Sequence, residues 1–203
     1  MRKILFSVCA VLAILGCGGD GDDFPCLSCG RCPNPVVSNG WVTCGGQTYR
    51  TVRIGSQTWF AENLNYNASG SVCYSNNSSN CTTYGRLYNW STAMAVCPSG
   101  WHLPSKAEWD ALGDDARKLK ATTGWDSGGN GTDDYGFSAL PGGYGSSDGS
   151  FGSVGYDGAW WSANENGNDS NYAYGRGMYY NYGNAYWDNY SKSNLFSVRC
   201  VQD

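Results

Sequence analysis

The segment Cys97-Pro-Ser-Gly-Trp101-His102-Leu-Pro-Ser105-Lys-Ala-Glu108-Trp109 carries the clearest local structural signal in this sequence. Ser105 and Glu108 have the spacing of a capping box, in which each side chain hydrogen-bonds the backbone N–H at the other's position. A helix is therefore expected to begin after Ser105. Its buried stripe continues with three further apolar positions, Leu112, Ala116 and Leu119, together with Trp109.

The sequence on either side of this segment predicts one more helix and several strands. Residues 84–95 place Leu87, Trp90, Ala93 and Met94 at helical spacing, and Cys97-Pro-Ser-Gly ends that helix. Residues 47–54 alternate polar and apolar side chains, Gly55-Ser56 forms a turn, and residues 57–60 return as the second strand of a hairpin. Beyond Gly124 the strand candidates are 136–139, 159–162, 172–180 and 196–201.

The N-terminus has the features of a secretory signal. Met1-Arg2-Lys3 is basic, an apolar run extends from Ile4 to Leu15, and Gly16 precedes Cys17. The run is shorter than the roughly 20 residues of a membrane-spanning helix. A cysteine after the small residue is typical of a bacterial lipobox, so we expect cleavage before Cys17 and acylation of that residue. The alternative is ordinary secretion with a free or disulfide-bonded Cys17.

This signal predicts an exported protein, anchored by lipid at the outer membrane or cell surface. We divide the chain into a signal peptide (1–16), a flexible acidic tether (17–25), a Cys-rich segment (26–45) and one folded domain (46–203). The acidic residues after Cys17 resemble the surface-export signal of some outer-membrane lipoproteins. The protein is expected to contact the membrane through the lipid anchor alone.

Composition limits the classes of partner. Charged residues make up 15% of the chain, against about 25% in a typical soluble domain, and aromatic residues another 15%. So many aromatics argue against disorder. The net charge of −4 offers no basic surface for phosphates, so nucleic acid is not an expected partner.

The cysteines agree with export. Of the ten, Cys9 leaves with the signal and Cys17 takes lipid, and an even set of eight in an exported chain predicts disulfides. Cys73 and Cys81 are expected to close a local loop. Cys26, Cys29, Cys32 and Cys44 have spacings that also suit a zinc site with four thiolates, but export favours disulfides. Their pairing is left open.

Several blocks of sequence, in this order, resemble one known family. They are Tyr49-x-Thr-Val-x-Ile-Gly-x-Gln-x-Trp59-x-Ala-Glu62-Asn-Leu64, Tyr84-Gly-x-Leu-Tyr-Asn-Trp90, the Cys97–Trp109 segment, Leu119-Lys120 with Gly124-Trp125 and Gly136-Phe-Ser-Ala-Leu-Pro-Gly-Gly143, Trp160-Trp-Ser162, and Val198-Arg-Cys-Val201. Over residues 46–203 the chain resembles the Fibrobacter succinogenes major paralogous domain family.

That family is similar to the C-type lectin-like and formylglycine-generating-enzyme (sulfatase-modifying-factor-like) folds. The resemblance implies an α+β domain with two helices on a small twisted antiparallel sheet and long loops. It also implies a disulfide between Cys97 and Cys200. The formylglycine-generating oxidases bind copper with a C-terminal cysteine pair, whereas only Cys200 stands in the last third of this chain. Oxidase activity is therefore not expected.

No residue pattern favours another enzyme. His102 is the sole histidine, so a structural role is expected for it and no His cluster can bind a metal. Asp133, Asp134, Asp157 and Glu165 could supply a carboxylate pair for glycoside hydrolysis, but their spacing does not favour one. We expect no enzyme activity and no cofactor. Calcium stays an alternative, with oxygen ligands from residues 126–134 or from Trp187-Asp188-Asn189.

The remaining feature is a run of aromatic residues in the Gly- and Asn-rich C-terminal part, with Trp160 and Trp161 at its start. We expect many of these rings, the tyrosines above all, to be exposed, because so many polar-tipped aromatics have little aliphatic filler around them. The alternative for Trp160 and Trp161 is a position in the core. Exposed rings stack on sugar faces, so the expected ligand is polysaccharide or another envelope or extracellular component. The candidate binding residues are Trp161, Tyr179, Tyr180, Tyr182 and Trp187. The alternatives are a structural or assembly protein of the cell envelope and a divergent enzyme.

Overall fold

The computed structural model describes residues 31–33 and 35–203. The signal peptide, Cys17, the tether, Cys26 and Cys29 lie outside the described residues. Within them, no helix combines the length and the apolar character needed to cross a bilayer.

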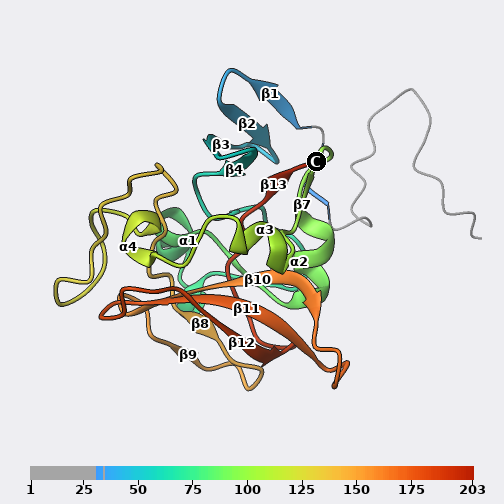
Figure 1. The fold of residues 1–203 in the computed structure, drawn as a ribbon. Helices are drawn as coiled ribbons and strands as arrows, with labels where there is room; N and C mark the ends of the chain where they lie inside the picture. Colours follow the sequence, from blue (N-terminus) through green and yellow to red (C-terminus); the bar gives the residue numbers. More distant parts are fainter. Residues whose placement is uncertain (1–30, 34) are drawn as a thin grey trace, which may run out of the picture.

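The larger sheet has six antiparallel strands (Figure 1). Its order is β1 (Val36–Ser38), β2 (Trp41–Cys44), β3 (Gln47–Ile54), β4 (Gln57–Phe60), β13 (Val201–Gln202) and β7 (Trp101–His102). The predicted hairpin is confirmed, since Ile54 pairs with Gln57 across the Gly55-Ser56 turn. The strands β1 and β2 extend the same sheet, so the segment before residue 46 joins the domain.

The second sheet has three strands, β10 (Asp157–Glu165), β11 (Tyr172–Tyr179) and β12 (Tyr186–Ser191), which run side by side in the lower part of Figure 1. The strands predicted at 159–162 and 172–180 are thus confirmed. Two small ladders complete the β-structure, β5 (Ser71–Val72) with β6 (Leu87–Tyr88) and β8 (Tyr144–Gly145) with β9 (Phe151–Gly152). The predicted strand at 136–139 is absent, and only the end of 196–201 enters β13.

The helices are short. They are η1 (Tyr74–Asn76), α1 (Ser78–Tyr84), α2 (Trp90–Val96), α3 (Lys106–Asp110) and α4 (Ala116–Leu119). The predicted capping box is present: the backbone N–H of Glu108 donates to Ser105 Oγ, and the Glu108 carboxylate accepts from the Ser105 N–H at 2.7 Å. Trp109, Leu112, Ala116 and Leu119 are buried as expected.

The expected fold class is wrong. Strands take up 36% of the chain and helices 15%, in several sheets that curl into a half-barrel, instead of two helices on one small sheet. Gly113, with φ of +79°, splits the expected second helix into α3 and α4. Gly85, with φ of +75°, turns the chain before Leu87, which pairs in β6 although its spacing is helical.

Two hydrophobic clusters lie on opposite sides of β10. Trp161 belongs to the first, with Tyr88 and Phe196, and Trp160 belongs to the second, with Trp59 and Trp109. The helix α2 contacts both β7 and β10, and α3 contacts β10 (Figure 1). The second sheet is therefore buried along residues 158–162 of β10, and its exposed positions lie on β12, at the strand ends and in the connecting turns.

Three disulfides join described cysteines. Cys73 pairs with Cys81 and Cys97 with Cys200, the two pairings expected from the sequence and the resemblance. The third joins Cys32 to Cys44. Because a disulfide sulfur is not a thiolate, this pairing excludes a zinc site made of the four N-terminal cysteines.

Candidate ligand-binding surface

Four tyrosines gather where β11 ends, and we call them the tyrosine surface: Tyr156, Tyr179, Tyr180 and Tyr182. Tyr182 is 58% exposed and Tyr156 42%, while Tyr179 and Tyr180 are half-buried. The ring of Tyr180 contacts those of Tyr156 and Tyr179 at centroid distances of 5.4 and 5.0 Å. Tyr182 meets Tyr179 at 5.4 Å. Three of these residues are candidates from the sequence, and the structure brings them together.

A buried lysine holds the turn that carries these rings. Lys120 is 1% exposed, and its Nζ donates to the carbonyl oxygens of Tyr179, Tyr180 and Tyr182 at 2.6, 3.3 and 3.1 Å. Burial lowers the pKa of Lys120, and the nearby carboxylate of Asp157 opposes that shift. Charge-assisted bonds of this kind are stronger than neutral ones, so the backbone below the tyrosines is fixed before any ligand arrives.

Trp161 is not a surface residue, and its assignment to a binding site is wrong. Its side chain is 0% exposed and its indole N–H donates to the carbonyl oxygen of Tyr88 at 2.7 Å. The neighbouring Trp160 is also fully buried and donates to Asn63 Oδ1 at 2.8 Å. Because β10 has a hydrophobic cluster on each side, successive residues of this strand are both enclosed.

Trp187 lies away from the tyrosine surface and is already engaged. Its indole N–H donates to Asp110 Oδ1 at 2.8 Å, and the ring meets Tyr174 edge-on. The ammonium of Lys106 lies 4.6 Å from the ring centroid and the guanidinium of Arg176 lies 5.0 Å from it. These contacts hold α3 against β11 and β12, so Trp187 stabilises the packing of α3 on the sheet.

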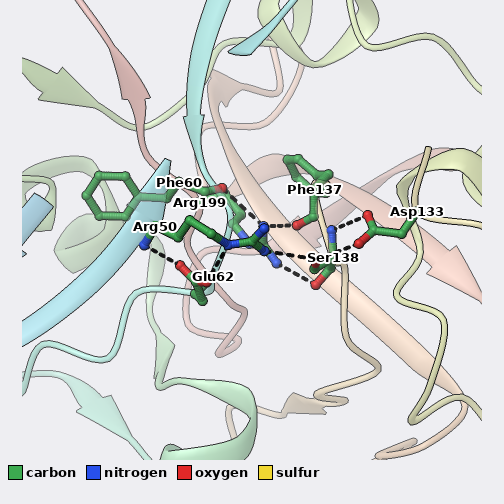
Figure 2. Close-up of polar contacts among 7 residues, drawn as sticks. All are labelled: Arg50, Phe60, Glu62, Asp133, Phe137, Ser138 and Arg199. Atoms are coloured by element: carbon green, nitrogen blue, oxygen red, sulfur yellow. Dashed lines mark hydrogen bonds and ion pairs between the residues drawn. The ribbon is translucent and has the colours of Figure 1, made fainter. Parts of the chain in front are cut away.

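A polar cleft of about 400 Å³ lies on another part of the molecule, between the segment after β4 at Glu62, the C-terminal end of α1 and residues 121–140. Figure 2 shows the arginine beneath it. Arg199 is 1% exposed and donates to the carbonyl oxygens of Phe60 and Ser138 at 3.1 and 3.0 Å, to that of Phe137, and to Asn63 Oδ1 at 2.7 Å.

The hydrogen bonds of Arg199 stabilise the fold and leave little of its charge available to a ligand in the cleft. Burial lowers the pKa of Arg199 to about 9, although the carboxylates of Glu62 and Asp133 oppose this. At the rim, Arg50 pairs with Glu62, and Asp133 accepts from Ser138 Oγ at 2.6 Å (Figure 2). The blocks of sequence that carry the family resemblance around residues 62, 137 and 199 therefore meet here, and their polar groups bond mostly to one another.

His102 is bound by carboxylates on both sides. Nε2 lies 2.8 Å from Glu108 Oε1 and Nδ1 lies 2.6 Å from Asp203 Oδ1. Burial opposes the imidazolium, but the hydrogen bonds with Asp203 and Glu108 outweigh it and raise the pKa of His102. With both ring nitrogens occupied, His102 has no nitrogen facing a nucleophile, and it ties β7 to α3 and to the C-terminus.

The calcium candidates do not converge. Between residues 31 and 203, position 34 excepted, no group of three or more His, Cys, Asp or Glu lies close enough to hold a metal ion. In the 126–134 loop, both carboxylate oxygens of Asp133 accept from Ser138. Asp188 accepts from the N–H of Asn189, within its own turn of chain.

Sequence reasoning missed the structural importance of Asn63, Lys120 and Arg199. Asn63 accepts from both Trp160 and Arg199, and its amide donates to the carbonyl oxygen of Tyr84 at 2.8 Å. The available signal was a polar residue inside an otherwise apolar run, as in Leu119-Lys120-Ala121 and Val198-Arg199-Cys200. Such positions predict a buried polar group with several partners.

Comparison with known families agrees with the resemblance seen in the sequence. The family model described as the Fibrobacter succinogenes major domain matches residues 52–202, nearly all of the folded part. No curated protein and no solved structure matches the chain. The matched region includes β4, every helix of the described residues and the segments that carry the tyrosine surface. The chain therefore belongs to the Fibrobacter succinogenes major domain family.

Proposed function

We propose that this domain is a non-catalytic module that binds polysaccharide on the tyrosine surface. The observation that carries the proposal is the grouping of Tyr156, Tyr179, Tyr180 and Tyr182 over a turn that Lys120 fixes from below. Exposed tyrosines offer large, rigid and amphipathic contact area at low entropic cost. A pre-organised turn reduces the ordering that binding would otherwise require.

The chemistry of the surface favours a neutral ligand over a charged one. The four tyrosines supply ring faces for stacking and hydroxyl groups for hydrogen bonds, and Lys120 is buried with its ammonium directed at carbonyl oxygens. An acidic polymer would require exposed cations at this site. The occupied nitrogens of His102 support the non-catalytic part of the proposal, because they leave the sole histidine without a free nitrogen to act as a general base.

A screen tests the proposal. The mature chain is incubated with insoluble cellulose, xylan and chitin and with a glycan array, with and without EDTA, and released reducing ends are measured in parallel. Retention without release of reducing ends, unchanged by EDTA, is the expected result. Release of sugar would identify an enzyme, and complete loss of retention in EDTA would identify a calcium-dependent site. No retention on any glycan would contradict the proposal.

A second candidate function is envelope assembly through protein contacts. The observation that favours it is the edge strand β1, where Val36 and Val37 are exposed beside Trp41 of β2. An exposed apolar edge can pair with another chain. A photo-crosslinking residue at Trp41 and another at Tyr182, used in intact cells, would separate the two functions. Protein adducts at Trp41 together with failure of the glycan screen would favour assembly.

We also propose that the protein is exported and anchored by lipid at Cys17, at the outer membrane or cell surface. The support is the lipobox of the sequence and the three disulfides of the domain, which form in oxidising compartments. Cys17→Ala should abolish palmitate labelling and membrane association in cell fractionation. Cys9→Ala, within the apolar run of the signal, is the matched control and should leave both unchanged. Labelling that persists in Cys17→Ala would contradict lipid anchoring.

A further inference from the structure

A second cavity, of about 390 Å³, is lined by Tyr190 of β12. Tyr190 lies on the opposite face of that strand from Trp187, the residue that contacts α3. The floor of the cavity is Phe196, which is 1% exposed, and its walls are the half-buried rings of Tyr144 and Tyr190. Both rings meet Phe196 edge-on, with centroid distances of 6.5 Å for Tyr144 and 4.7 Å for Tyr190. The cavity is thus lined by three aromatic residues and is open to solvent.

One partly buried carboxylate faces this cavity. Asp157 begins β10, and its closest side-chain partner is the hydroxyl of Tyr186, which donates to its two oxygens at the long distances of 3.3 and 3.4 Å. Burial raises the pKa of Asp157 to about 6, while the hydrogen bonds from Tyr186 and the N–H of Gly158 and the charge of Lys120 oppose the shift. The carboxylate therefore has hydrogen-bonding capacity left for a ligand.

Small residues on β11 leave space for the aromatic rings of β12 beside the cavity. The face of β11 toward the cavity has Ala173, Gly175 and Gly177, and the ring of Tyr190 lies close against Gly175. A Cβ atom added at Gly175 would lie 2.9 Å from Cδ2 of Tyr190, so a side chain there would displace the ring. Tyr186 covers Gly177 in the same way and places its hydroxyl at Asp157.

We propose that this cavity binds a single non-acidic hexose ring, with Asp157 accepting hydrogen bonds from its hydroxyls. Aromatic walls fit the apolar faces of a sugar ring, and Asn194 and Ser153 add polar groups at the rim. The cavity volume is that of a small-molecule site. The same carboxylate excludes uronic acids, because two carboxylates in one buried site repel each other.

This inference rests on the proposed function, because it specifies the sugar chemistry of a site adjoining the tyrosine surface. Asp157 lies directly opposite Tyr179 in the β10–β11 pairing and follows Tyr156 in the chain. A polysaccharide chain stacked on the tyrosine surface would then present one ring, or its end, to the cavity. Ionisable groups facing Asp157 are Tyr186 and Tyr190 from β12 and Lys120 from the segment after α4.

The test measures binding of free sugars to the mature chain by saturation-transfer NMR and by calorimetry. The probes are glucose, galactose, mannose and N-acetylglucosamine, with glucuronic and galacturonic acids as their acidic counterparts. At pH 7.5 at least one neutral sugar should bind and both acids should not. Asp157→Asn should keep binding of that neutral sugar within about threefold and strengthen binding of the matching uronic acid at least tenfold. Asp148→Asn, an exposed carboxylate on the β8–β9 turn, is the control and should change neither.

Two results would overturn the inference: no neutral sugar binds, or Asp157→Asn leaves the discrimination against uronic acids unchanged. Tyr182→Ala distinguishes this failure from failure of the proposed function. It should weaken polysaccharide retention while leaving free-sugar binding unchanged, because its side chain does not line the cavity. If polysaccharide retention depends on Tyr182 and no free sugar binds, the result supports polysaccharide binding at the tyrosine surface and contradicts the sugar site in the cavity.

Discussion

At the scale of single residues, Asp157 shows how burial changes a side chain that looks ordinary in the sequence. Burial disfavours the charged form and raises the pKa of Asp157 from its ordinary value of 3.8 to about 6. In the unfolded chain that penalty is absent. Below about pH 3.8 Asp157 is protonated in both the folded and the unfolded chain, so burial of a charge costs the folded state nothing. As the pH rises through about 6 the buried group becomes charged, and this contribution to the free energy of unfolding is lost.

Asp157→Asn should therefore be more stable than the wild type at neutral pH. The shift of about 2 pKa units corresponds to about 3 kcal/mol. Between pH 4 and pH 7.5, the free energy of unfolding of the variant should rise by up to about this amount relative to the wild type. Guanidinium denaturation at both pH values measures the difference. Asp148→Asn should show no such rise, and a wild type that gains stability relative to Asp157→Asn above pH 6 would contradict the assigned burial.

Trp161 and Tyr182 illustrate what the sequence can and cannot say about exposure. Both stand in an aromatic, glycine-rich segment, yet Trp161 is 0% exposed and Tyr182 58%. The difference comes from β10, which lies between two hydrophobic clusters that form from distant parts of the chain. The residues next to Trp161 in the sequence do not show that β10 is covered on both faces. The polar turn around Tyr182, in contrast, can be recognised from Asn181-Tyr182-Gly183.

At the scale of elements, the sequence correctly predicted those strands and helix starts whose hydrogen bonds join residues close together in the chain. The β3–β4 hairpin has the predicted bounds, and α3 begins after the predicted cap. The helical spacing of Leu87 with Trp90 was misleading, because Leu87 pairs with Val72 in a ladder. The helix end at Gly113 could have been found from Gly113-Asp114-Asp115, in which Asp115 caps α4 by accepting from the N–H of Arg117.

The cap of α3 gives a test at this scale. Ser105→Ala removes the oxygen that accepts from the N–H of Glu108, and should lower the free energy of unfolding by about 1 kcal/mol. Sugar and polysaccharide binding should be unchanged. Ser79→Ala, at an exposed position inside α1, is the matched control and should be neutral or slightly stabilising. A loss of less than a few tenths of a kcal/mol for Ser105→Ala would mean that the cap does not stabilise α3.

At the scale of the whole molecule, long-range links hold together a chain with little regular helix. The Cys97–Cys200 disulfide spans 103 residues and joins the end of α2 to the residue before β13. A loop of about 100 residues corresponds to roughly 4–5 kcal/mol in the chain-entropy model. Family resemblance predicted this link, but the half-barrel arrangement follows from how two clusters share β10, which no single segment encodes.

The position of the tyrosine surface also belongs to this scale. Lys120 comes from the segment after α4, Tyr156 precedes β10, Tyr179 ends β11, and Tyr180 and Tyr182 follow it. Only the folded chain brings these segments together, through hydrogen bonds between Lys120 and residues about 60 positions away. Because the turn is fixed from inside, removal of an outer ring should change the contact area for a ligand without changing the fold.

The most direct test of polysaccharide binding compares two exposed tyrosines at opposite ends of one hairpin. Tyr182 belongs to the tyrosine surface, and Tyr172 begins β11 at the far end. Affinity electrophoresis on the polysaccharide that retains the wild type should show binding weakened about 5- to 30-fold in Tyr182→Ala, equivalent to roughly 1–2 kcal/mol. Tyr172→Ala should bind like the wild type, and both variants should keep its melting temperature. Equal binding by Tyr182→Ala and the wild type, or equal losses in the two variants, would contradict binding at the tyrosine surface.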